Sequence, residues 1–391
     1  MRCDVVIVRY GEVGIKRQRA RSRYERTLVR NIEARLTHLG IPYERIVREW
    51  GRLFIITKDE RAAAEAANVF GVVSASPAAR CAPVLDEVAE VAASVAAEHL
   101  KEGDSFAIRA RRAGEHPFTS QEVAVVCGDA VRERVKGVHV DLNSPDVEVF
   151  VEVRQGAAYV YTHIARGVGG LPIGTQGKMV GLVSGGIDSP VACWLMMKRG
   201  CELVGLYIDL SPYADVRTKE RAMDTLRRLS EWCVGHPIRV YEVPVGRIME
   251  QIKKTLPPGM TCVLCKRMMY RIAACVMRRE GALGIITGSS LGQVASQTAM
   301  NMTAEVHGMG VPIYHPLIAM DKTESIALAR QIGTYSISTE PVGGCTAVPA
   351  HPRVSVKPDE VTEAERKIGL QELVEMCMQE ATVHTLDPRN Q

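Results

Sequence analysis

The fold of the second half of the chain follows from one octapeptide, Val183-Ser184-Gly185-Gly186-Ile187-Asp188-Ser189-Pro190. The apolar residues 179–183 before it are typical of a buried parallel strand, and residues 191–200 after it predict a helix ending at a glycine. The octapeptide therefore lies at a strand-to-helix turn. Its two glycines let the backbone approach a ligand closely, and the free N–H groups of the helix N-terminus favour an anion there.

This turn differs from the common phosphate loop, which needs a glycine, four further residues and then Gly-Lys-Ser/Thr. The nearest match, Gly177-Lys178-Met179, has neither the hydroxyl residue nor the upstream glycine. The hexapeptide from Ser184 to Ser189 instead resembles the pyrophosphate loop (PP-loop) of ATP pyrophosphatases, which cleave ATP between the α and β phosphates. A carboxylate such as Asp188 suits an anion site if it works with a metal ion or holds the loop, so we expect ATP together with Mg²⁺.

The composition is ordinary for a soluble globular protein. The 391 residues are enough for two or three domains, and 46% are hydrophobic and 24% charged. No apolar run approaches the roughly 18 residues of a membrane span, so we expect no membrane association. Eleven cysteines without a signal peptide predict reduced thiols and a cytoplasmic location rather than a disulfide framework.

Positive charge is concentrated at the N-terminus. Residues 1–60 hold 14 Lys and Arg against 8 Asp and Glu, a net charge of +6, whereas the rest of the chain sums to −2. Lys16 and Arg17 open the densest basic run, which extends to Arg30. A helix with so many cations repels itself, and a polyanion would relieve that repulsion. A solvated helix face is the alternative interpretation.

Three arginines, Arg109, Arg111 and Arg112, form a second basic cluster where a predicted strand at residues 106–111 leaves its sheet. Such a cluster suits phosphate contacts, and a solvated rim explains it equally well. We therefore take these arginines, with Lys16 and Arg17, as candidate RNA-binding residues.

The pattern along the chain predicts two α+β units followed by an α/β unit. We expect the first unit at residues 1–60, the second at 61–167 and a glycine-rich linker at 168–178. From residue 179 to 391, strands alternate with helices, which predicts a parallel sheet with helices on both faces. Ligands of such sheets bind beyond the carboxyl ends of the strands, where the octapeptide also lies.

Two further stretches carry polar groups. Residues 288–298, Gly-Ser-Ser-Leu-Gly-Gln-Val-Ala-Ser-Gln-Thr, follow an apolar strand and supply uncharged hydrogen-bonding groups suited to a nucleotide, although a polar loop is the plain alternative. Asp321 is placed to cap a helix, and Lys322 follows it at the helix N-terminus, against the preference of the helix dipole. An anionic ligand near Lys322 would explain its position.

Taken together, the order of units and the motifs at 184–189, 288–298 and 316–324 resemble the tRNA 4-thiouridine synthetases, or tRNA sulfurtransferases, over essentially the whole chain. The resemblance implies an N-terminal ferredoxin-like domain, an RNA-binding THUMP domain and a PP-loop ATP pyrophosphatase domain. It implies that ATP adenylates the C4 oxygen of the uridine at position eight of tRNA, that sulfur then displaces AMP, and that the protein is a homodimer. Some relatives also supply sulfur for thiamine thiazole synthesis, and the sequence leaves that role open.

The resemblance also assigns residues by matching motifs. Asp188 and Lys322 match positions needed for adenylation. The expected ATP contacts are Leu182, Val183, the loop from Ser184 through Gly185, Gly186 and Asp188 to Ser189, Tyr207, Ile208, Arg267, Gly288 and Gln297.

The chain departs from the bacterial form in lacking a C-terminal rhodanese-like domain before Gln391, and so resembles the rhodanese-free, archaeal-type form. Cys262 and Cys265 form a C-x-x-C pair near a helix N-terminus, where the dipole should lower the thiol pKa, and Cys345 matches a cysteine of the family. Three thiolates suit an iron–sulfur cluster with one open iron, which would hold sulfide. A structural zinc would need a fourth ligand, for which His351 is conceivable.

The sulfur donor, sulfide or a persulfide carrier, stays open at this stage. Two other classes of protein also stay open: a different PP-loop enzyme of tRNA modification, and a non-catalytic tRNA-binding iron–sulfur protein. The intact PP-loop and the pair Asp321-Lys322 favour an enzyme over the second of these.

Overall fold

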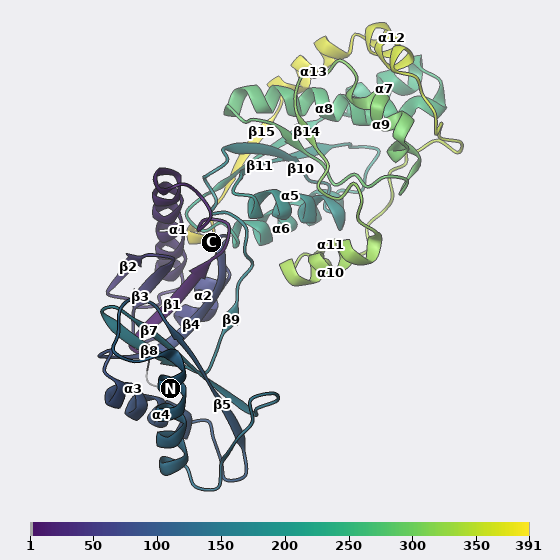
Figure 1. Ribbon diagram of the computed structural model, residues 1–391. Coiled ribbons are helices and arrows are strands. Elements are labelled where there is room, and N and C mark those ends of the chain that lie inside the picture. The colour runs from purple at the N-terminus through teal and green to yellow at the C-terminus, as the bar shows by residue number, and fades with distance from the viewer. Residues whose placement is uncertain (1–2, 391) are drawn as a thin grey trace. The chain divides into compact units, whose positions relative to one another are not determined.

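The computed structural model describes residues 3–390, which form two compact units, one that ends at Gly170 (unit 1) and one that begins at Leu171 (unit 2). Unit 1 is an α+β unit and unit 2 is an α/β unit, as Figure 1 shows for each of them. Among the described residues, no helix is both long enough and apolar enough to cross a membrane.

Unit 1 is built on one nine-stranded sheet, with the strand order β2-β3-β1-β4-β8-β7-β5-β6 and with β9 paired to β4. Its elements are β1 (Val5–Tyr10), α1 (Gln18–His38), β2 (Arg45–Glu49), β3 (Arg52–Ile56), α2 (Arg61–Ala67), β4 (Val72–Cys81), α3 (Leu85–Ala97), β5 (Ser105–Arg112), α4 (Ser120–Arg134), β6 (His139–Val140), β7 (Val147–Arg154), β8 (Ala157–Tyr161) and β9 (Ala165–Arg166).

Strand β4 joins the two α+β units that the sequence predicts as separate. Its first part pairs with β1, from Val72 to Ala78, and its last residues, Ala79 to Cys81, pair with β8. The first α+β unit therefore extends beyond residue 60. The start of β4 adds a strand to its sheet, and α2 lies between residue 60 and that strand. Local patterning did not reveal this strand, because six of its ten residues are alanine, serine or proline.

The sheet of unit 1 curves, so side chains of strands that are not neighbours in the sheet meet on its concave face. The ring of Phe54 on β3 stacks on Tyr159 of β8 at 4.8 Å between centroids, although β1 and β4 lie between these strands. A small apolar cluster fills this concave face, and a group of charges continues it.

The buried carboxylate of Glu152 on β7 is the centre of that charge group. It lies 2.9 Å from Nη1 of Arg154, 3.2 Å from Nε of Arg52 and 3.9 Å from Nη2 of Arg9. Arg9 and Arg52 come from strands of the first α+β unit, whereas Glu152 and Arg154 come from the second. The carboxylate therefore holds the two halves of unit 1 together.

We expect Glu152→Gln to lower the free energy of unfolding of unit 1 by about 3–5 kcal/mol, because Arg9 and Arg52, at 15% and 23% exposure, lose the buried carboxylate that they pair with. Glu148→Gln is the matched control, since Glu148 lies on the same strand and pairs with Arg109 at the surface, where such a pair contributes about 0–1 kcal/mol. Calorimetry of the full chain would measure both. An equal loss of unfolding free energy in the two variants would contradict the role of Glu152.

Unit 2 contains a six-stranded sheet with the order β14-β13-β10-β11-β12-β15, and helices cover both of its faces (Figure 1). Its elements are β10 (Lys178–Leu182), α5 (Asp188–Lys198), β11 (Glu202–Asp209), α6 (Arg217–Ser230), β12 (Ile238–Pro244), α7 (Gly246–Thr255), α8 (Thr261–Glu280), β13 (Ile285–Ile286), α9 (Ala299–Val306), β14 (Ile313–Tyr314), α10 (Lys322–Ile332), α11 (Tyr335–Ser338), α12 (Pro358–Ile368), α13 (Leu370–Gln379) and β15 (Thr382–Leu386).

The predicted parallel sheet is confirmed for five of these strands. The sixth, β15, comes from the C-terminal end of the chain and pairs antiparallel with β12. The parallel strands are apolar because helices cover both faces, and α7, α8, α12 and α13 contribute to one large core on one side. Part of the glycine-rich stretch expected as a linker also belongs to this unit, since Leu171 and Ile173 are buried and the N–H of Leu171 donates to the carbonyl of Lys198.

Candidate functional site

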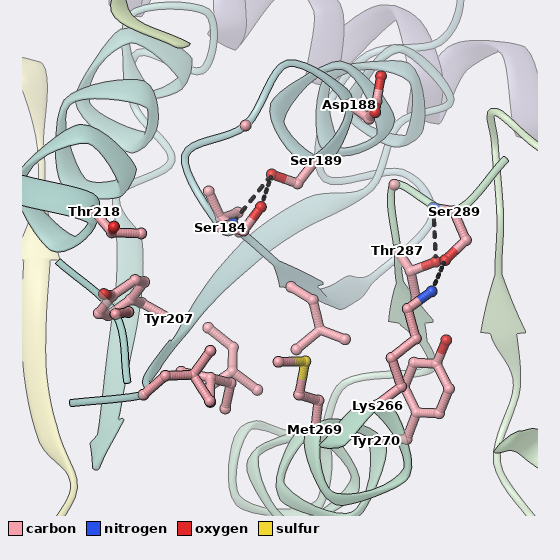
Figure 2. A pocket seen from close by; sticks show the side chains of 18 of the residues that line it. Ser184, Asp188, Ser189, Tyr207, Thr218, Lys266, Met269, Tyr270, Thr287 and Ser289 are labelled. Atoms are coloured by element: carbon pink, nitrogen blue, oxygen red, sulfur yellow. Dashed lines mark hydrogen bonds between the residues drawn. The ribbon is translucent and has the colours of Figure 1, made fainter. Parts of the chain in front are cut away.

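A cavity of about 290 Å³ lies at the carboxyl ends of β10, β11 and β13, where the sequence predicts a nucleotide site. Figure 2 shows the loop before α5 on one side of it and side chains of α8 on another. Ten of the expected ATP contacts line the cavity, namely Leu182, Val183, Ser184, Gly186, Asp188, Ser189, Tyr207, Ile208, Gly288 and Gln297.

The PP-loop presents backbone donors to this cavity. Helix α5 begins at Asp188 without a side-chain cap, which leaves its first N–H groups available to an anion. The N–H of Ser184 donates to Oγ of Ser189 at 3.1 Å, and the two hydroxyl oxygens lie 3.4 Å apart (Figure 2). Gly185 is not a lining residue. Its φ of +75° and the backbone N of Ala222, 2.8 Å from where a Cβ would stand, explain why a glycine shapes this turn.

Gly288 lets the chain leaving β13 touch the PP-loop backbone. A Cβ at this position would lie 2.7 Å from the backbone N of Ser189 and 2.8 Å from the carbonyl carbon of Asp188. Because both of these atoms are backbone atoms, no side chain can rotate away to make room. The close approach of Gly288 therefore holds the first turn of α5 in position.

We expect Gly288→Ala to displace the PP-loop and to reduce kcat/KM for ATP by about ten-fold or more, since overpacking of this kind costs about 1–3 kcal/mol. Gly156→Ala is the control, because nothing lies within 4 Å of a Cβ at that position in unit 1. Steady-state pyrophosphate release at varied ATP would compare the two variants. An unchanged KM and kcat in Gly288→Ala would show that the loop tolerates the shift.

Asp188 and Lys322 meet at the edge of the cavity. Nζ of Lys322 lies 2.8 Å from each carboxylate oxygen of Asp188, and Nε2 of Gln293 donates to one of them at 3.1 Å. Lys322 is the first residue of α10, and Asp321 caps that helix as the sequence predicts, accepting from the N–H groups of the first turn. The lysine side chain is 44% exposed, so its ammonium can exchange Asp188 for a phosphate.

Helix α8 supplies a wall of the cavity that the sequence analysis missed. Lys266, Met269 and Tyr270 lie on one face of this helix at i, i+3 and i+4, and all three line the cavity (Figure 2). Nζ of Lys266 donates to Oγ of Ser289 at 3.0 Å, and burial lowers the pKa of this lysine. The opposite wall is apolar around Tyr207, whose pKa burial raises to about 12.

Arg267, an expected ATP contact, is not among the residues that line the cavity. One residue along a helix turns by about 100°, so Lys266 faces the cavity while Arg267 faces the core. Arg267 is 2% exposed, forms an ion pair with Glu365 at 2.8 Å and donates to the carbonyls of Glu305 and His307. It thus ties α8 to α9 and α12.

Cys262 and Cys265 lie in the first turns of α8, and Cys345 lies on an exposed loop. Burial raises the pKa of both helix thiols, that of Cys265 to about 12, and a Coulomb effect of Cys345 is the next cause for each, so the three thiols are neighbours. The expectation of lowered pKa values for this pair is wrong, because desolvation by burial is the largest cause for both thiols and raises their pKa values. Within residues 3–390, no three His, Cys, Asp or Glu side chains are arranged to hold a metal ion, so the three cysteines do not yet converge on one centre.

Glu305 on α9 is an unusual neighbour of these groups. Its side chain is fully buried, and neither carboxyl oxygen has a hydrogen-bond partner in the described part of the chain. Burial raises its pKa to about 8, with a Coulomb effect of Lys266 in the opposite direction. Lys266 and the cysteine pair lie close enough for the charge of Glu305 to act on their pKa values.

The candidate RNA-binding residues lie in unit 1. Arg109 and Arg111 line a second hollow of about 550 Å³ with Glu148 and Phe150. The side chain of Arg112 donates to the backbone carbonyls of Gly114 and His116. Lys16 and Arg17 precede α1, with Nζ of Lys16 5.7 Å from the ring centroid of Tyr24 and Arg17 exposed to solvent.

Comparison with protein families gives three matches along the chain. A ThiI ferredoxin-like domain matches residues 5–76, a THUMP domain matches residues 83–163, and the thiamine biosynthesis protein ThiI matches residues 174–370. The ferredoxin-like, THUMP and PP-loop organisation predicted from the sequence is confirmed.

Comparison with individual proteins gives full-length relatives. A protein of Methanosarcina mazei named "Probable tRNA sulfurtransferase" is 52% identical over 97% of this chain and 95% of its own length. A protein of Caldanaerobacter subterraneus with the same name is 38% identical over 95% of this chain and 97% of its own length. Among solved structures, a 4-thiouridine synthetase in complex with RNA and ATP is 32% identical, covers 98% of this chain and 100% of its own, and has a TM-score of 0.88. A protein structure from Pyrococcus horikoshii is 30% identical, covers 84% of this chain and 99% of its own, and has a TM-score of 0.66.

Proposed function

The chain belongs to the ThiI family, and we propose from that membership and from its ATP-type cavity that it is an ATP-dependent tRNA sulfurtransferase that makes 4-thiouridine. The observation that carries this proposal is the likeness, over 98% of the chain, to a 4-thiouridine synthetase bound to RNA and ATP. In this chain, the PP-loop and the cavity lie where that chemistry requires them, at the carboxyl ends of parallel strands.

The first half-reaction is adenylation. The C4 oxygen of the uridine attacks the α-phosphorus of ATP, the bond to the β-phosphate breaks and pyrophosphate leaves, while the N3 proton passes to solvent. The N–H groups at the start of α5 and the hydroxyl groups of Ser184 and Ser189 bind phosphate oxygens. Lys322 stabilises the charge that develops on them, and Asp188 positions Lys322 and would hold Mg²⁺, which would neutralise phosphate charge.

The second half-reaction places sulfur on the base. Sulfide sulfur attacks C4, the C4–O bond breaks, AMP leaves with the former uridine oxygen, and C4=S remains. We assign Cys262, Cys265 and Cys345 to an iron–sulfur cluster, since three neighbouring thiols are the donors that iron–sulfur clusters prefer. Such a cluster would supply sulfide when bound, and these cysteines would hold it only if Cys345 approached α8, because the three thiols do not converge in this structure.

Unit 1 binds the tRNA. Its basic N-terminal segment and Arg109, Arg111 and Arg112 contact phosphates, which fixes the position of the RNA without reading its sequence. The sulfur comes from sulfide or a persulfide carrier, and we propose that the protein works in the cytoplasm as a homodimer.

The test uses tRNA transcripts with and without the target uridine. The full chain with ATP should release pyrophosphate in the presence of tRNA that has uridine at position eight, and a transcript with cytidine there should bind equally well but release none above background. Pyrophosphate release that is the same with both transcripts, or absent with both, would contradict the proposed reaction.

A further inference from the structure

The tip of the hairpin between β2 and β3 carries an exposed tryptophan that the reaction does not use. The side chain of Trp50 is 76% exposed, although a tryptophan is among the side chains that water disfavours most. We propose that Trp50, backed by Arg21, is a stacking platform for an unpaired nucleobase of the bound tRNA. This inference rests on the proposed function and adds a site to it.

The ring of Trp50 is held from one side by a cation. The guanidinium carbon of Arg21 on α1 lies 4.2 Å from the ring centroid, close enough for a cation–π contact. The other guanidinium contacts of Arg21 go to the carbonyl oxygen of Lys16, at 3.2 and 3.4 Å, so the arginine is itself fixed. A base that stacks on the remaining ring face would extend this cation–ring stack.

The backbone beneath the ring is braced. Nη2 of Arg154 donates to the carbonyl oxygen of Trp50 at 2.7 Å, and Nε of Arg154 lies 3.4 Å from the carboxylate of Glu49. Gly51 follows with φ of +74°, which allows the tight turn into β3. The hairpin tip is thereby fixed to β7, and a pre-positioned aromatic side chain loses little entropy when a ligand stacks on it.

The charge around Trp50 favours a nucleic acid as the occupant. Arg21 belongs to the basic run at residues 16–30, whose exposed members include Arg17, Arg19, Arg23 and Arg26. A nucleic acid presents both a phosphate charge for these arginines and an aromatic face for the indole, whereas an apolar protein surface would leave the cations unpaired. Unstacked bases on aromatic side chains are also the usual mode by which proteins contact single-stranded RNA.

Tryptophan fluorescence of the full chain tests the platform directly. Trp194 is 1% exposed and Trp232 is half-buried against it, so Trp50, at 76%, is the most exposed of the three indoles. Saturating tRNA should quench part of the emission of the parent protein and leave the emission of Trp50→Phe unchanged. In binding assays, Trp50→Ala should weaken tRNA affinity by about 5- to 100-fold and Trp50→Phe by less. The salt dependence should be unchanged, because the phosphate contacts remain.

The control is Val84→Ala, because Val84 is another exposed apolar residue of unit 1. This variant should bind tRNA as the parent does. Unchanged fluorescence together with unchanged affinity of Trp50→Ala would overturn the platform. So would quenching that depends on protein concentration without RNA, which would identify a contact between copies of the chain. If the parent makes 4-thiouridine but Trp50 shows no response, only the platform fails; if the parent makes none, the proposed function fails.

Discussion

Asp188→Ala and Lys322→Ala are each expected to reduce AMP formation by about 100- to 1000-fold, the usual cost of removing one preorganised electrostatic contact. Nζ of Lys322 lies 2.8 Å from both oxygens of Asp188, so each residue positions the other beside the PP-loop. Binding of tRNA should survive, because the candidate tRNA contacts lie in unit 1. Single-turnover AMP formation and a tRNA-binding assay on the same preparations measure the two effects.

Because Asp188 and Lys322 form an ion pair, we also expect that their separate effects on AMP formation do not add up in the double variant. When two residues act as a unit, replacing either one reduces the rate about as much as replacing both. The double variant should therefore form AMP nearly as fast as the slower single variant. Lys357→Ala is the control, since Lys357 also stands at a helix start, that of α12, but has no place in the cavity. Near-parental AMP formation in either single variant would defeat the assignment, and multiplied losses would show independent roles.

Serine at Cys262, Cys265 or Cys345 is expected to leave pyrophosphate release intact and to abolish 4-thiouridine. A hydroxyl group cannot replace a thiolate as an iron ligand or sulfur carrier, whereas the ATP cavity is lined by other residues. The result would be an enzyme that spends ATP and adenylates the base without thiolating it, and AMP would then leave only when water attacks C4 in place of sulfide and restores uridine. Mass spectrometry of digested tRNA, run beside a pyrophosphate assay, gives both quantities.

Cys275→Ser is the matched control for these three variants. Cys275 lies on the same helix, α8, and its sulfur accepts from Nη2 of Arg278 rather than facing the other cysteines. It should thiolate tRNA as the parent does. If the triple serine variant still makes 4-thiouridine from sulfide, the cysteines are not the sulfur site.

The PP-loop could be predicted from the sequence because its determinants are local. A strand, two glycines, hydroxyl residues and a helix follow one another within a few residues, and the structure keeps them in that order around the cavity. The same holds for Asp321, which caps α10 by bonding to residues only two and three positions away.

Contacts between distant segments could not be predicted in this way. Whether Lys266 or Arg267 faces ATP depends on the rotation of α8 against the sheet, which neighbouring residues do not encode. The pairing of β15 with β12 joins residues more than a hundred apart, and the cluster of Arg9, Arg52 and Arg154 around Glu152 forms only because the sheet of unit 1 curves. The raised pKa of Cys265 likewise depends on burial that its own segment does not reveal.

The most direct measurement follows the oxygen of the target base. A tRNA whose target uridine carries a heavy-oxygen label at C4 is incubated with the full chain, ATP and sulfide, and the AMP and the digested tRNA are analysed by mass spectrometry. Adenylation of the C4 oxygen predicts that the label leaves the base, that the base gains sulfur, and that AMP carries the label in its phosphate in equal amount. Unlabelled AMP, or thiolated base formed without labelled AMP, would contradict it.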